Sequence, residues 1–78
     1  MKKPILTIFF KKKNGDVSKH RSRSKRRILL KLRRVSGSEY RFYKIRTHYK
    51  KGLKNETAWL SNKDETRNAI YAFTEKGL

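Results

Sequence analysis

The sequence predicts an α+β fold, in which an antiparallel sheet of three to four strands carries one C-terminal helix packed on one face. Two patterns predict it. Short β-branched and aromatic stretches, separated by glycine-containing turns, occupy residues 4–60. Apolar residues at helical spacing follow in residues 62–75. A length of 78 residues allows one small domain, 1–78, and no second one.

A first hairpin is predicted near the N-terminus. Residues 4–10 are β-branched and aromatic and form its first strand. Asn14-Gly15 is a two-residue turn signal, because both residue types tolerate positive φ. The returning strand is placed at 16–20. The segment 19–27 contains no apolar residue and is predicted to be an exposed basic arm or loop.

A second hairpin is predicted from residues 28–35 and 39–49, joined by a Gly37-Ser38 turn. A two-residue turn aligns the apolar faces of these strands, because a slip of one residue would reverse every side chain. The aligned apolar faces are Ile28, Leu30 and Leu32 with Tyr43, Ile45, Thr47 and Tyr49. The opposite face carries Leu29, Lys31 and Arg33 with Tyr40, Phe42, Lys44, Arg46 and His48.

The last third of the chain is predicted to be a short strand followed by a helix. A polar connection over 50–55 leads to the strand at 57–60. Ser61 is the predicted N-cap of a helix over 62–75, which has two carboxylates in its first turn. Its apolar face is formed by Thr66, Ala69, Ile70 and Phe73.

The charge of the chain is large and unevenly distributed. There are 23 Lys or Arg residues and 6 Asp or Glu residues, which gives a net charge of +17. Twenty basic residues and two acids give residues 1–54 a charge of +18, whereas residues 55–78 carry −1. A charge that served only solubility would be spread evenly. The tail therefore indicates a scaffold, and the first two-thirds indicate a surface for a polyanion.

Several classes of function are excluded by composition. The chain has no cysteine and only two histidines, so no metal site and no cofactor are expected. No apolar run approaches the length of a membrane span. A membrane-surface partner is disfavoured because the C-terminal helix has no basic face. The expected location is intracellular: cytoplasmic or nucleoid-associated, or nuclear in a eukaryote.

Two groups of residues are the candidate binding site. One face of the predicted second hairpin alternates cations with aromatic rings, which suits phosphates and unpaired bases. The basic arm adds further phosphate contacts. The candidates are Arg21, Arg23, Lys25, Arg26, Arg27, Lys31, Arg33, Tyr40, Phe42, Lys44, Arg46 and His48. Trp59, as the largest apolar group, is assigned to the core.

Two families resemble parts of the chain. The segments 30–35, 43–49 and 58–61, the last leading into Asp64-Glu65, resemble the transcriptional positive-cofactor-four family of coactivators, which bind single-stranded DNA. This resemblance covers residues 28–73, but Glu56-Thr57 stand where the family has a lysine-glycine pair. Residues 61–65 are similar to the helix start of the arm-type DNA-binding domain of tyrosine recombinases. That resemblance implies a sheet placed in the major groove of duplex DNA.

The sequence thus predicts a non-enzymatic nucleic-acid-binding protein, with DNA ahead of RNA and single-stranded DNA slightly ahead of duplex. The first alternative is an RNA-binding or ribosome-associated structural protein that uses charge alone. A remote alternative is a small basic ribonuclease toxin, with His48 beside Tyr49 as an acid–base pair. Such toxins usually place helices before the sheet, which this order lacks. A homodimer is left open.

Overall fold

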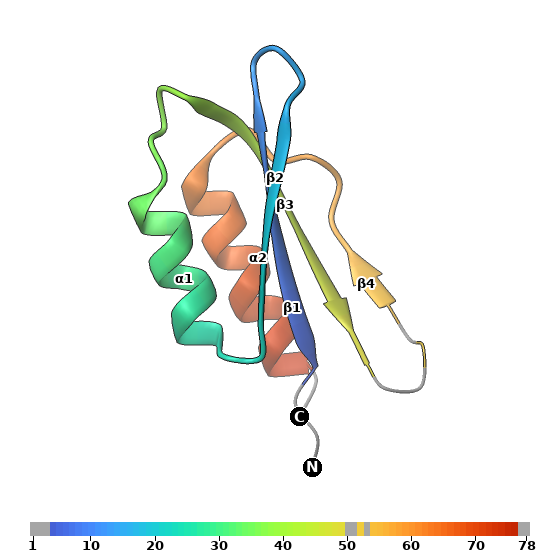
Figure 1. The fold of residues 1–78 in the computed structure, drawn as a ribbon. Coiled ribbons are helices and arrows are strands. Elements are labelled where there is room, and N and C mark those ends of the chain that lie inside the picture. The colour runs from blue at the N-terminus through green and yellow to red at the C-terminus, as the bar shows by residue number, and fades with distance from the viewer. Residues whose placement is uncertain (1–3, 50–51, 53, 77–78) are drawn as a thin grey trace.

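The computed structural model describes residues 4–49, 52 and 54–76, and its elements follow the order ββαββα. The strands and helices are β1 (Ile5–Lys12), β2 (Val17–Ser22), α1 (Lys25–Arg34), β3 (Tyr40–His48), β4 (Lys54–Glu56) and α2 (Lys63–Lys76). The four strands form one antiparallel sheet in the order β2-β1-β3-β4. Both helices lie on the same side of this sheet (Figure 1). The α+β class and the C-terminal helix are confirmed.

The core lies between the sheet and the helix layer. Alternate residues of β1 and β3 point into it, and each helix adds its own apolar face. Its fully or almost fully buried apolar residues are Leu6, Ile8, Phe10, Ile28, Leu32, Tyr43, Ile45 and Ile70. Each such side chain contributes roughly 1.5–3 kcal/mol by leaving water, so this small cluster provides most of the stability of the fold.

The largest error of the sequence prediction concerns α1. Residues 28–35 were predicted to be a strand, but residues 25–34 form a helix. The apolar residues of this segment fit both periods, and burial selects Ile28 and Leu32, which are four residues apart on one helical face. Ser24 caps the helix, because its side chain accepts a hydrogen bond from the backbone N–H of Arg27.

The predicted basic arm at 19–27 is also wrong, because part of this segment belongs to α1. β2 continues to Ser22 and α1 begins at Lys25, so this segment is a strand, a short turn and the first turn of a helix. The predicted Gly37-Ser38 hairpin turn is also wrong. Residues 37–39 form a turn between α1 and β3 instead.

The short last strand lies earlier than predicted. β4 spans Lys54–Glu56, whereas the predicted strand at 57–60 keeps only an isolated bridge between Leu60 and Tyr43. Part of the predicted connection over 50–55, at residues 50–51 and 53, lies outside the described residues. The helix α2 begins after Asn62 and not after Ser61, because the Asn62 side chain accepts the hydrogen bond from the backbone N–H of Glu65 at 2.8 Å.

The first hairpin is confirmed, but its turn spans residues 13–15 and not the predicted two residues Asn14-Gly15. β1 and β2 pair over Leu6–Lys11, and Gly15 has φ +99°, the left-handed conformation that favours glycine in this turn. The backbone N–H of Gly15 donates to the carbonyl of Lys12 at 3.0 Å. This hairpin makes β1 a central strand, with β2 on one side and β3 on the other.

Candidate nucleic-acid interface

The sheet has one face that neither helix covers, and this open face can be read from the strand register. Leu6, Ile8 and Phe10 point toward the helices, so the alternating residues of β1 point the other way. The same alternation holds for β3, where Tyr43, Ile45 and Thr47 are buried. The open face, defined in this way, consists of Ile5, Thr7, Phe9, Lys11, Val17, Lys19, Arg21, Phe42, Lys44, Arg46, His48 and Glu56.

Rings and cations alternate across the two central strands of the open face. Phe9 of β1 lies opposite Lys44 of β3, and Lys11 lies opposite Phe42. Directly opposed side chains in an antiparallel pair contact each other, and diagonal neighbours remain within reach of long side chains. Each ring therefore has a cation beside it, in a two-by-two checkerboard.

Trp59 extends this checkerboard beyond the sheet. The ammonium of Lys11 lies 4.4 Å from the centre of the Trp59 ring and 5.2 Å from that of Phe42. Lys44 lies 5.3 Å from the Trp59 ring and 5.7 Å from the Phe9 ring, and the guanidinium of Arg46 lies 4.9 Å from the Phe9 ring. Such contacts are worth about 0.5–1 kcal/mol each where they are exposed, so they hold rings and cations in place.

One acid lies among these cations. Glu56 of β4 accepts hydrogen bonds at the same carboxylate oxygen from Lys44, at 2.5 Å, and from Arg46, at 3.1 Å. Hydrogen bonds from these two cations lower the pKa of Glu56 below its ordinary value. The Nε of Arg46 is buried and has no hydrogen-bond partner among the described residues. Glu56 therefore offsets part of the positive charge of β3, while Lys11, Lys19 and Arg21 form no ion pair with the described residues.

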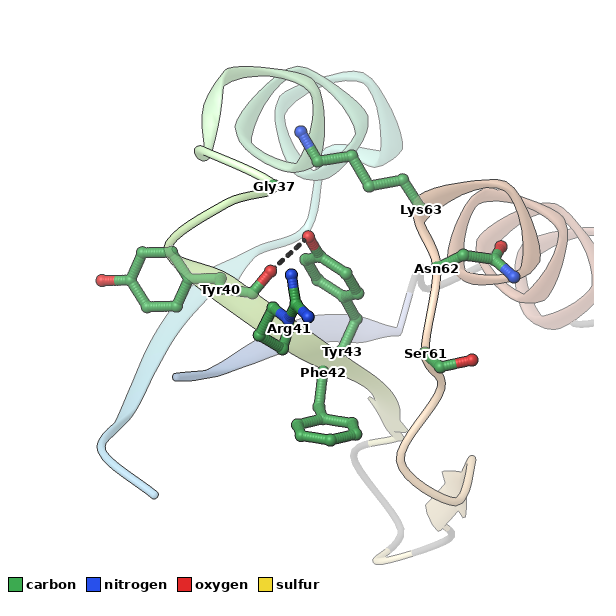
Figure 2. Close-up of a pocket in the computed structure, with 8 residues that line it drawn as sticks. All are labelled: Gly37, Tyr40, Arg41, Phe42, Tyr43, Ser61, Asn62 and Lys63. Carbon is green, nitrogen blue, oxygen red and sulfur yellow. Dashed lines mark hydrogen bonds between the residues drawn. The ribbon is translucent and has the colours of Figure 1, made fainter. Parts of the chain in front are cut away.

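The structure brings together five of the candidate residues on this face. Phe42, Lys44, Arg46 and His48 share it as the alternation of β3 predicted, and Arg21 joins them from β2, where it pairs with Thr7. Figure 2 shows the change of side at the start of β3, with Tyr43 pointing toward the helices and Phe42 pointing away from them.

Tyr40 was predicted to lie on the same face as Phe42, and that prediction is wrong. The register between β1 and β3 shifts between Lys11 and Lys12. This irregularity turns Tyr40 toward the helix side, where its ring lies 5.7 Å from that of Phe10 and packs against the core. Tyr40 also accepts a hydrogen bond at its carbonyl from the Tyr43 hydroxyl, at 2.8 Å (Figure 2).

The remaining candidates do not lie on the open face. Arg23 is in the turn before α1, and the other five belong to the helix layer on the opposite side of the sheet, namely Lys25, Arg26, Arg27, Lys31 and Arg33. The single surface predicted from the sequence is therefore divided between two sides of the molecule.

Three residues of the site were missed or misassigned: Phe9, Lys11 and Trp59. Lys19 was predicted as part of the basic arm and lies on the open face. In β1, Thr7, Phe9 and Lys11 alternate with Leu6, Ile8 and Phe10 in the sequence. Because most of residues 4–10 are β-branched or aromatic, this pattern does not separate the two faces. Trp59 was assigned to the core and instead lies beside the open face, under Lys11 and Lys44. No pattern in its own segment indicates this side.

A hollow lies between the end of α1 and the start of α2, close to the edge of the open face (Figure 2). Lys63 spans it, and its ammonium donates to the carbonyl of Val35 at 2.5 Å. A Lys side chain at this position satisfies a carbonyl at the end of α1 and offsets the negative end of the helix dipole. The hollow therefore serves the contact between the helices. Of its two cations, Lys63 and Arg41, Lys63 is already occupied.

Neither of the two helices in the described part of the chain has the length and apolar character needed to cross a bilayer. Among residues 4–49, 52 and 54–76, no three His, Cys, Asp or Glu side chains gather in an arrangement that could hold a metal ion. The chain matches no protein-family model, no curated protein and no solved structure.

Proposed function

We propose that this chain is a non-enzymatic nucleic-acid-binding protein that binds single-stranded DNA on its open sheet face. The observation that carries this proposal is the checkerboard of Phe9, Phe42 and Trp59 with Lys11 and Lys44, on a face that neither helix covers. An intracellular location, cytoplasmic or nucleoid-associated, accords with this ligand.

Single strands are favoured over duplexes because aromatic rings need unpaired bases. A base that stacks on an exposed ring contributes roughly 1–3 kcal/mol, and every base has a flat face to offer. In a duplex, the bases already stack on one another. A base placed on Phe9 or Phe42 would carry its phosphate within reach of the adjacent lysine, which adds the electrostatic contact.

Alanine at Phe42 tests the proposal directly. We expect Phe42→Ala to weaken binding of an oligothymidylate of about 12 nucleotides by about 5- to 150-fold, since one stacking contact is lost. Titration followed by fluorescence anisotropy measures this change. The melting temperature and the salt dependence should stay near those of the parent, because the ring lies outside the core and displaces no counterions.

Tyr71→Ala is the matched control. Tyr71 is an exposed aromatic residue of α2, on the helix side of the sheet, with 39% of its surface accessible. The Tyr71→Ala variant should bind the oligothymidylate as tightly as the parent does. Equal losses for both variants, or no loss for Phe42→Ala, would refute the open face as the site.

RNA and duplex DNA of equal length, measured at two salt concentrations, test the ligand class. Trp59, the only tryptophan, gives a second readout through quenching of its fluorescence.

A further inference from the structure

We infer that a bound single strand continues from the open face around the edge of β2 and onto helix α1. This inference rests on the proposed function, and it narrows the substrate to single strands long enough to reach both surfaces. It is carried by three features: the position of β2 at the sheet edge, a line of cations on α1 that form no ion pair with the described residues, and a hollow that joins the two.

β2 is an edge strand, so no further strand separates the open face from the helix side. Lys19 and Arg21 lie on its open-face side, opposite Phe9 and Thr7 respectively. α1 follows β2 after a two-residue turn and packs on the other side of β1 and β2 (Figure 1). A chain that leaves the open face across β2 therefore meets α1 next.

The cations of α1 that face this edge form a line. Arg27, Lys31 and Arg34 are exposed and stand at positions i, i+4 and i+7, on one side of the helix. The line is about 10 Å long at 1.5 Å per residue, which equals about three nucleotide steps at the 3.4 Å rise of one DNA strand. None of the three is in an ion pair with the described part of the chain.

These cations oppose one another in the folded protein. Like charges at i,i+4 destabilise a helix by roughly 0.2–0.5 kcal/mol per pair, and α1 has no acid in its first turn to compensate. A row of phosphates supplies the missing counter-charge. In this respect the line differs from Lys44 and Arg46, which share Glu56.

A hollow connects this line with the sheet. Lys31 and Arg34 border it from α1, while Lys19 and His20 border it from β2. Hydroxyl groups of Ser18, Ser36 and Tyr40 also line it, and Phe10 and Val35 add apolar surface. Its one acid, Glu39, lies 3.0 Å from the ammonium of Lys12, so the negative charge of this wall is already paired.

The path excludes a duplex. A strand that passes from one face of a sheet to the helix on the other face must reverse its direction within a few nucleotides. Bending duplex DNA by only 40–90° over 20–30 base pairs already costs about 1–6 kcal/mol, whereas a single strand bends freely. Only a single strand can therefore follow this path, whereas a duplex can contact either the open face or α1 but not both together.

The test is a length series with the triple variant Arg27→Gln, Lys31→Gln and Arg34→Gln, in which glutamine keeps the helix propensity. The matched control, Lys13→Gln, Arg41→Gln and Arg67→Gln, removes the same charge from three exposed positions outside this line. Of the two oligothymidylates, that of about 6 nucleotides lies within the range of about 4–16 nucleotides covered by known single-strand-binding folds, and that of about 24 exceeds it. Circular dichroism confirms that each variant folds.

We expect the α1 variant to bind the short strand as tightly as the parent and the long strand more weakly. Its slope of log affinity against log salt should fall by about 2 for the long strand only, at about 0.7 per phosphate contact. Equal weakening at both lengths, no weakening at either, or an equal effect of the control variant would overturn the inference. Two short strands bound per protein would overturn it as well, because they would indicate separate sites. If Phe42→Ala leaves the short strand unaffected, the proposed function fails instead.

Discussion

The two helices pack side by side on the same face of the sheet, yet their charges differ. α1 carries six cations in ten residues and no acid, whereas the fourteen residues of α2 contain three basic and three acidic residues. α2 also has Asp64 and Glu65 in its first turn, where carboxylates stabilise the positive end of the helix dipole. In α1 those positions hold Arg26 and Arg27.

The difference shows which part of the charge needs a functional explanation. Both helices face solvent from one layer, so a requirement for solubility would act on both. The charges of α1 reduce the stability of the helix that carries them, and α1 is held instead by its Ser24 cap and by burial of Ile28 and Leu32. This contrast supports the proposal that the α1 charges serve a ligand, while both helices contribute buried residues to the core.

The largest expected effects test whether the core holds both helices equally. Ile28 and Ile70 are each completely buried, one from α1 and one from α2. We expect Ile28→Ala and Ile70→Ala each to lower the free energy of unfolding by roughly 2–5 kcal/mol, measured by urea denaturation. A much smaller loss of unfolding free energy for Ile28→Ala than for Ile70→Ala would show that α1 contributes little to the stability of the fold. The two helices would then differ in packing as well as in charge.

A single exchange of charge in each helix sharpens the comparison. Arg27→Glu places a carboxylate three residues after Ser24, which creates a capping box at the start of α1. We expect a gain of about 0.5–1 kcal/mol in stability from the dipole and the cap, together with weaker binding of long single strands. Thermal melting and anisotropy measure the two changes.

The corresponding exchange in α2 is Arg67→Glu. Arg67 pairs with Asp64 at 2.6 Å, so this change replaces an attraction with a repulsion. It should lower stability slightly, by about 0.2–0.5 kcal/mol, and leave binding of short strands unchanged. If Arg27→Glu were destabilising too, the charges of α1 would not oppose its folding.

The smallest expected effect concerns the acid of the open face. The pKa of Glu56 is lowered by Lys44 and Arg46, so its contribution to stability exists above the ordinary glutamate pKa and is lost as pH falls through the lowered value. Over the same range, protonation of Glu56 frees both cations, and binding of a short single strand should strengthen.

Glu56→Gln should bind more tightly at neutral pH, with a steeper salt slope and without this acid-range rise in affinity. Each released cation adds about 0.7 to the slope at most. No carboxylate among the described residues pairs with the line of Arg27, Lys31 and Arg34 on α1. The ratio of the affinity for the long strand to that for the short strand should therefore not change with pH in this range. If this affinity ratio also changed as the pH fell, Glu56 would affect binding beyond the open face.

The parts of the fold that were predictable from the sequence are those with one dominant local pattern. Strict alternation placed Tyr43, Ile45 and Thr47 in the core, with Phe42 and Lys44 on the other face. Asn14-Gly15 marked the first turn, and helical spacing with early acids marked α2. Each of these segments is compatible with only one periodicity.

The parts that failed depend on contacts between distant segments. The run from Ile28 to Val35 has apolar residues at both strand and helix spacing, so packing of Ile28 and Leu32 against the sheet decides its structure. The side on which Trp59 lies depends on Lys11, which is 48 positions earlier. Tyr40 changes side because of an irregularity in pairing with β1, which its own segment does not reveal.

The central place of β1 has a further consequence for how the chain folds. β1 must pair with β3 across the 27 residues from 13 to 39, which contain ten basic residues and two acids. Closing this loop draws a charge of +8 into a small volume before the core contacts of β3 can form. Salt shortens the range of this repulsion from about 10 Å at 0.1 M to about 3 Å at 1 M. We therefore expect the rate of folding to rise with ionic strength. A polyanion that gathered the same charges would likewise promote closing of the sheet.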